Sequence, residues 1–299
     1  MILRAIAGLD RWLSRQNPAY RPVSQYKCHL PAVSLRAVFK EDTVMIANYH
    51  AHTTRCNHAT GTEREYVEAA IRRGLKIFGF SDHTPQYFPG GYCTFMRMRT
   101  HELPEYCMEV RKLQREYRDQ IQIRLGLEVE YYPAIWKDLL LRAQDAGVEY
   151  MILGQHWLGN EIDEPGSAAP TADAELLRRY CHQVMDAMQT GKITYIAHPD
   201  LLNFVGDSRV YRQHVRELCR AAKETGTPLE INLLGLAYGR HYPNALFWEV
   251  AAEEGCSAIL GLDAHAPDQI LNKEPEAHAM EMVRNLGINL LETAELKRI

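Results

Sequence analysis

The chain has 299 residues, of which 46% are hydrophobic and 24% are charged, a composition typical of a globular protein. The net charge of −4 gives no overall attraction to nucleic acid, and no apolar run reaches the about 18 residues that a membrane span needs. These values exclude a disordered, fibrous or membrane-spanning chain. They leave the 13 histidines as the unusual feature of the composition.

The seven cysteines are widely spaced, and no two of them form a CxxC pair. An odd number at such spacing argues against a disulfide framework and against a cysteine-rich zinc site. It favours a reducing, cytoplasmic setting.

The first 44 residues differ in charge from the rest of the chain. Residues 1–40 contain seven basic residues and one acid, which makes them +6 and leaves −10 on the remainder. We interpret residues 1–44 as a basic extension, either an appended arm or a stretch upstream of a true start at Met45. A targeting segment is the alternative, whereas charges at Arg4, Asp10 and Arg11 argue against a secretory signal.

From Met45 onward, short apolar runs alternate with longer amphipathic stretches. The apolar runs predict strands over 45–50, 76–81, 121–129, 150–155, 193–197, 228–232 and 257–262. The amphipathic stretches predict helices over 63–74 and near 102–118, 134–146, 173–190, 209–225, 244–254 and 276–286. Several of these stretches are followed by glycine, which is typical of helix C-termini.

Seven βα units predict a parallel sheet covered by helices, and their number favours closure into a barrel over an open sheet. Residues 45–299 contain no linker rich in Pro, Gly or Ser, so we expect one barrel domain there. The stretch 159–172 is expected to be a surface loop after the fourth strand.

Almost every predicted strand ends in side chains that can bind a metal. In chain order these are His50 and His52 with His58 close behind, Asp82 and His83, Glu128 and Glu130, His156, His198 and Asp200, Glu230 and Asn232, and Asp263 and His265. In a parallel barrel the C-terminal ends of all strands lie at one face, which carries the active site. Imidazole and carboxylate together suit Zn, Mn or Fe better than Ca or Mg.

Histidines outside this pattern have a simpler interpretation as ordinary polar residues. They are His29, His101, His182, His214, His241 and His278, on helical or loop stretches. Cys56 lies among the candidate ligands and is either a thiolate ligand or a small packing residue, and we favour packing.

The motifs around these strand ends resemble those of a known family. NYHAHTTRCNHATG followed by EYVEAAIRRGLKIFGFSDHTP resembles the opening of the polymerase-and-histidinol-phosphatase (PHP) superfamily, and the similarity is greatest to its histidinol-phosphate phosphatases. LGLEVEYYP, ILGQHW, AHPDLL, LEINLLGL and GLDAHAP follow in the same order, so the resemblance covers about residues 45–290. It implies an α/β fold, a distorted (β/α)7 TIM-like barrel with a metal site at the C-terminal ends of the strands.

The resemblance also implies a centre of three divalent ions. Matched by motif, the ligands are His50, His52 and Asp263 for the first ion, Glu128 as a bridge to the second, His156 and His198 for the second, and His58, His83 and His265 for the third. Glu128 is preferred to Glu130 because the family's acid lies two residues after the strand glycine.

Clustered divalent ions suit the hydrolysis of phosphate esters. Asp82 and Asp200 are candidate proton donors, or alternatively they orient the neighbouring histidines. Arg97, Arg99 and Arg240, in loops at the same face, are candidates for binding the phosphate, because Arg forms bidentate contacts with it. Each of them could instead be a surface charge.

The sequence thus predicts a metal-dependent phosphatase acting on L-histidinol phosphate in histidine biosynthesis. A PHP-type phosphoesterase for another small ester, such as a nucleotide or sugar phosphate, is the first alternative, and a non-catalytic metal-binding module is the second. We expect a small phosphorylated substrate and neither nucleic acid nor membrane as a partner. A homo-oligomer is left open.

Overall fold

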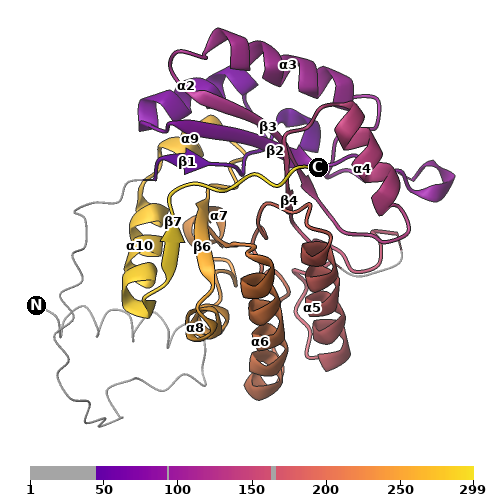
Figure 1. Cartoon of the computed structure of the whole chain (residues 1–299), viewed down its shortest axis with the longest axis vertical. Coiled ribbons are helices and arrows are strands. Elements are labelled where there is room, and N and C mark those ends of the chain that lie inside the picture. Colours follow the sequence, from indigo (N-terminus) through magenta and orange to yellow (C-terminus); the bar gives the residue numbers. More distant parts are fainter. Residues whose placement is uncertain (1–44, 93, 163–165) are drawn as a thin grey trace, which may run out of the picture. The chain divides into compact units, whose positions relative to one another are not determined.

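A computed structural model describes residues 45–92, 94–162 and 166–299, in which parallel strands alternate with helices (Figure 1). The extension expected over 1–44 and part of the loop expected over 159–172 lie outside these described residues. Within the described chain, no helix is both long and apolar enough to cross a membrane.

All but the last of the strands form within or close to the predicted apolar runs. The strands are β1 (Ala47–Asn48), β2 (Ile77–His83), β3 (Gln122–Val129), β4 (Tyr150–Leu153), β5 (Leu229–Asn232), β6 (Ser257–Gly261) and β7 (Asn289–Leu291). The helices are α2 (Glu63–Arg73), α3 (Leu103–Glu116), α4 (Trp136–Asp145), α5 (Ala174–Gln189), α6 (Ser208–Thr225), α7 (Leu233–Ala237), α8 (Ala245–Glu254), α9 (Pro267–Leu271) and α10 (Glu274–Leu286). Two short 3-10 helices, η2 (Thr54–Cys56) and η3 (Pro89–Gly91), lie in the loops after β1 and β2.

Local sequence signals explain where the helices begin and end. At the start of α2, Thr62 and Glu65 form a reciprocal capping box, which satisfies backbone donors that the first turn leaves free. The same helix ends at Gly74, whose φ of 93° is a left-handed conformation that suits glycine. At the start of α6, the side chain of Asp207 caps the helix by accepting from the amide of Arg209.

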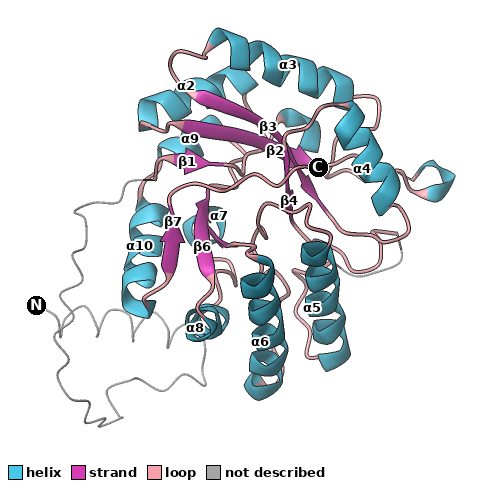
Figure 2. Ribbon diagram, viewed as in Figure 1, coloured by secondary structure: helices cyan, strands magenta, loops and turns pink. Residues whose placement is uncertain are grey.

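The strands pair in parallel as two sheets, β1-β2-β3-β4 and β5-β6-β7. Isolated bridges join them: Ile196 pairs with Leu153 beside β4 and with Leu229 of β5, and Ala51 pairs with Ala264 beyond the end of β6. These bridges close the strands into a distorted barrel, and Figure 2 shows the helices on the outer side of the strands. The predicted fold class is confirmed.

Two strand predictions need correction. The segment 193–197 is shorter and less regular than predicted, because the chain turns directly after it at His198, whose φ is 29°. It still pairs with both neighbours: the amides of Thr194 and Ala197 donate to the backbone oxygens of Met151 and Leu153, both at 2.8 Å, and the amide of Ile196 donates to that of Pro228 at 3.0 Å. The short strand β7, which pairs with the first residues of β6, was not predicted. Its three residues are only partly buried, so they lack the apolar signal of the other strands.

Inward-facing side chains fill the barrel below its C-terminal end. They are Ala47, Tyr49, Tyr150, Ile152, Tyr195, Ala197 and Ile259. The Tyr150 hydroxyl donates to the backbone oxygens of Tyr49 and Phe80 at 2.7 and 3.0 Å, and Gly126 leaves room for its ring. The C-terminal tail crosses the strands (Figure 1) and packs Ala294 against this cluster. These side chains form a packed layer inside the barrel, which we call the floor. The C-terminal ends of the strands lie beyond this layer, where the site can form.

Candidate metal centre

The predicted ligands converge at the C-terminal ends of the strands, although they come from six separate segments of the chain. Ligand atoms lie within 4.8 Å of one another in five sets: His50, His52 and Asp263; His50, Glu128 and His198; His52, His83 and Glu128; His58, His83 and His265; and His52, Cys56 and His265. The ninth predicted ligand, His156, lies beside them, with its Nε2 atom 3.6 Å from Oε1 of Glu128. All nine predicted metal ligands are thus brought into one cluster.

Glu128, at the end of β3, is the centre of this cluster. Its Oε2 atom lies 2.8 Å from Nδ1 of His83, and its Oε1 atom lies 3.0 Å from Nε2 of His198 and 3.5 Å from Nε2 of His50. A Cβ at Gly154 would fall on this carboxylate, so the absence of a side chain there leaves it room. Both carboxylate oxygens therefore face several histidines, as a bridging carboxylate requires.

The barrel closes where Ala51 pairs with Ala264, and we call this junction the barrel seam. Backbone pairing there places the HxH motif of residues 50–52 beside the DxH motif of residues 263–265. The amide of His52 donates to the oxygen of Ala264 at 2.9 Å, and the amide of Ala264 donates to the oxygen of His50 at 3.4 Å. Asp263 has a φ of 50°, a value uncommon outside glycine, and its Oδ1 atom lies 3.1 Å from Nε2 of His52. The seam thus places three candidate ligands around one point.

A carboxylate that the sequence placed at a strand end but gave no role orients this group. Oε1 of Glu230, on β5, accepts from Nδ1 of His50 at 2.8 Å, while its Oε2 accepts from the amide of His198 at 2.9 Å and from Asn232 at 3.1 Å. Asn232 also donates to Oδ2 of Asp263 at 3.1 Å. The signal was available, since Glu230 and Asn232 end a predicted strand two residues apart.

The buried donor set fits metal ions. Nε2 of His50 and Nε2 of His52 are buried, and neither has a hydrogen-bond partner within the part of the chain that the structure describes. Burial lowers the pKa of His50, but Glu230, Asp263 and Glu128 outweigh it and hold the pKa well above the ordinary value. The site therefore concentrates negative charge that a cation would balance.

Comparison with known proteins agrees with this geometry. A family model described as the PHP domain matches residues 48–233. This chain belongs to the PHP family. The probable histidinol-phosphatase of Deinococcus radiodurans is 32% identical over 251 residues, which cover 81% of this chain and 94% of that protein. The histidinol-phosphatase of Bacillus subtilis is 26% identical over 250 residues and covers 72% and 92%.

A solved structure extends the comparison to the whole PHP barrel. The histidinol phosphate phosphatase of Lactococcus lactis, complexed with zinc, L-histidinol and phosphate, matches with a TM-score of 0.66. The two chains are 22% identical, and the match covers 84% of this chain and 99% of that one. The likeness at this identity concerns the fold, and the family resemblance found in the sequence is confirmed.

The two aspartates proposed as proton donors have different surroundings in the PHP site. Asp82 accepts at Oδ2 from the amide of Thr53 at 3.1 Å, and its Oδ1 lies 3.6 Å from Nδ1 of His52. Asp200 accepts from the amide of Asn244 at 2.5 Å, and burial raises its pKa to about 7. The contacts of Asp82 favour an orienting role, and Asp200 stays a candidate donor.

The three candidate phosphate-binding arginines also differ. Arg97 is buried and already paired with carboxylates, whereas Arg99 and Arg240 are exposed. Arg97 and Arg99 both line a cavity of about 310 Å³ in the loop after β2. Arg240 donates to the hydroxyl of Tyr242 at 2.5 Å, and the Tyr242 ring lies 5.8 Å from that of His198. Arg240 is thus placed next to the ligand cluster.

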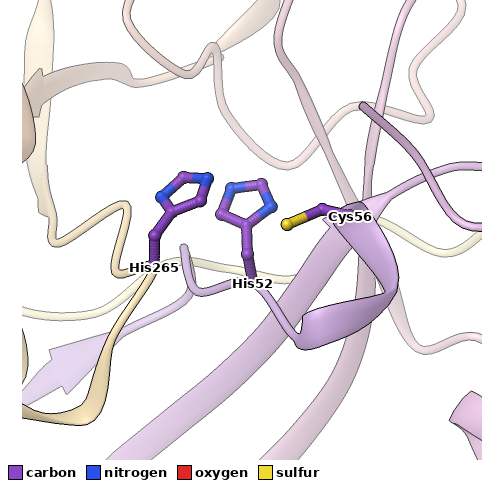
Figure 3. A group of neighbouring side chains, drawn as sticks. All are labelled: His52, Cys56 and His265. Carbon is purple, nitrogen blue, oxygen red and sulfur yellow. The ribbon is translucent and has the colours of Figure 1, made fainter. Parts of the chain in front are cut away.

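Cys56 lies against the cluster without a charge of its own. The rings of His52 and His265 stack with centroids 4.1 Å apart, and the Cys56 thiol points toward His52 (Figure 3). Burial raises the pKa of Cys56 to about 12. Its Sγ atom nonetheless lies within 4.8 Å of ligand nitrogens of His52 and His265, so the structure groups Cys56 with the candidate ligands.

The remaining histidines that the structure describes lie outside all of these ligand sets. They are His101, His182, His214, His241 and His278. His241 is near the cluster, but its Nε2 atom bonds to the backbone oxygen of Leu201 at 2.8 Å.

Proposed function

We propose that this PHP protein is a metal-dependent phosphatase that hydrolyses L-histidinol phosphate to L-histidinol and phosphate, a step of histidine biosynthesis. The observation that carries the proposal is the clustering of nine ligand-type side chains, among which five histidines lie within 3.6 Å of the carboxylate of Glu128. The substrate follows from relatives named histidinol-phosphatase, one of which matches this chain over 94% of its length.

The cofactors we propose are three divalent ions, taken as Zn with Mn or Fe as the other candidates. The ligands would be His50, His52 and Asp263 for one ion, Glu128 as a bridge, His156 and His198 for another, and His58, His83 and His265 for the third. Bound ions of this kind bind phosphoryl oxygens, lower the pKa of water and stabilise charge on the attacking and leaving oxygens. Zinc is the metal in the Lactococcus lactis structure.

The chain's own residues prepare this chemistry by orientation. The hydrogen bond from His50 Nδ1 to Glu230 leaves Nε2 of that ring to face Glu128 and Asp263. Asp82 holds the loop after β1 through Thr53. Arg99 and Arg240 remain the exposed cations proposed to hold phosphate, and Asp200 is proposed to supply a proton to the leaving alcohol.

The same proposal includes a reducing, cytoplasmic setting. Five cysteines lie within the described residues, and all five are free and buried. Free thiols in this number suit a compartment that keeps them reduced.

The direct test is phosphate release by the purified chain. The protein is loaded with Zn or Mn and assayed with L-histidinol phosphate, a nucleoside monophosphate and ribose 5-phosphate at equal concentration. We expect kcat/KM to be highest with L-histidinol phosphate. A preference for another ester would move the function to the alternative phosphoesterase, and bound metal without hydrolysis of any ester would support the non-catalytic module.

A further inference from the structure

We propose that Arg97 is a positioning residue, which acts through Glu130 to fix the ring of His156 and thereby the metal ion that His156 holds. This inference rests on the proposed ligand role of His156. It replaces phosphate binding as the role of Arg97.

The guanidinium of Arg97 is already fully engaged at both terminal nitrogens. Its Nη1 atom donates to Oε2 of Glu130 at 3.0 Å and to the backbone oxygen of Thr84 at 2.8 Å, and its Nη2 atom donates to Oε1 of Glu130 at 2.9 Å. Nη2 also pairs with Glu161. The residue is only 2% exposed. A phosphate at this fork would have to displace two carboxylates that also repel it, so the phosphate role is unfavourable.

Glu130 connects this arginine to the candidate centre. Its Oε1 atom accepts from Nδ1 of His156 at 3.0 Å. With the proton held on Nδ1, the other nitrogen, Nε2, has its lone pair free, and that atom lies 3.6 Å from Oε1 of Glu128. A carboxylate that fixes the tautomer and direction of a metal-binding histidine is a common arrangement.

Glu130 has its own reason to need the arginine. Its side chain is only 1% exposed, and a buried carboxylate is costly unless a cation pairs with it. The bidentate fork of Arg97 fixes both carboxylate oxygens in direction, which the single ammonium of lysine does not do. Gln86 adds only one neutral contact, from Nε2 to Oε2 of Glu130 at 3.3 Å. The orientation of His156 therefore depends on Arg97.

The pairing also joins loops from separate parts of the chain. Arg97 lies in the loop after β2, Glu130 follows β3, and His156 and Glu161 lie in the segment after β4. One buried guanidinium thus sets the relative position of three loops at the barrel mouth. This role explains why an arginine at the barrel mouth is buried among carboxylates and not exposed to solvent.

The test compares metal retention with catalysis in Arg97→Lys and Glu130→Gln. Each purified protein is loaded with Zn, dialysed against a chelator of fixed strength and analysed for metal per chain. We expect each variant to lose one ion per chain under conditions where the unaltered protein keeps it, with an affinity about 10–100-fold weaker. In the phosphatase assay kcat should fall while KM changes little.

Arg124→Lys is the matched control, because Arg124 lies on β3 in an ion pair with Glu149 at 3.1 Å, away from the ligand cluster. It should keep its metal and its activity. Full metal retention in Arg97→Lys together with a raised KM would overturn the inference in favour of phosphate binding. Thermal unfolding of each metal-free variant separates loss of the ion from loss of the fold, and the metal readout holds even if histidinol phosphate is not the substrate.

Discussion

Replacing Glu230 with glutamine tests how the centre is oriented. The carboxylate accepts three hydrogen bonds, one at Oε1 from Nδ1 of His50 and two at Oε2 from the amide of His198 and from Asn232. A glutamine has only one acceptor oxygen. If that oxygen serves His198 and Asn232, its NH₂ group faces His50, which then moves its proton from Nδ1 to Nε2. If the amide turns over, its NH₂ group faces two donors instead.

The first arrangement removes the lone pair that His50 directs toward Glu128 and Asp263, and the second leaves two buried donors without acceptors. Changes at groups that orient metal-binding histidines weaken metal affinity about 10–100-fold, which corresponds to about 1.4–2.8 kcal/mol. We expect Glu230→Gln to weaken the affinity for zinc by an amount in this range, although the substitution keeps the size of the side chain.

Affinity is measured by competition with a chromogenic zinc chelator, and the melting temperature of the metal-free protein checks the fold. Glu253→Gln is the matched control, because Glu253 pairs with Arg216 at 2.6 Å on the surface of α8 and has no contact with the centre. Metal affinity within twofold of the unaltered protein in Glu230→Gln, with an intact fold, would refute the orientation argument.

Three further predictions follow from close contacts. Gly154→Ala places a methyl group on the carboxylate of Glu128, so metal per chain should drop while the fold is kept, and elemental analysis with circular dichroism checks both. Gly126→Ala forces a methyl group into the ring of Tyr150, and urea unfolding should show a loss of about 1–3 kcal/mol; an unchanged midpoint would mean that the floor is not tightly packed. Asp263→Ala should remove metal and phosphatase activity together, and full activity after this change would contradict the ligand assignment.

The part of the fold that the sequence predicts is the part with a strong apolar signal. The runs at 76–81 and 121–129 are buried strands because nearly all their side chains leave water, and α2 begins and ends at residues whose capping chemistry is local. The segment 193–197 has the same apolar signal. It pairs with both neighbours through backbone hydrogen bonds, but the pairing is short because the chain turns at His198 directly after it, and the apolar pattern gives no sign of that turn.

The site divides in the same way. Candidate ligands are visible in the sequence because each follows a strand, and the topology alone brings strand ends together. The role of Arg97 is not visible, because its partners Glu130 and Glu161 are 33 and 64 residues away and nothing local shows that its fork is occupied. Arg97 and Arg99 are alike in sequence, and only burial separates a structural cation from one open to a ligand.

The closure of the barrel also explains why the centre needs the whole domain. Ala51 pairs with Ala264 at the mouth, while the first residues of β6 pair with β7. The seam therefore closes at the end where His52 and Asp263 meet, and Leu262 strengthens it by donating its amide to Oδ1 of Asn48 at 2.9 Å. Ligands at opposite ends of the domain sequence are thus neighbours only in the closed barrel. Metal binding should consequently stabilise the barrel as a unit, because an ion held by both His52 and Asp263 would oppose the separation of the segments that follow β1 and β6.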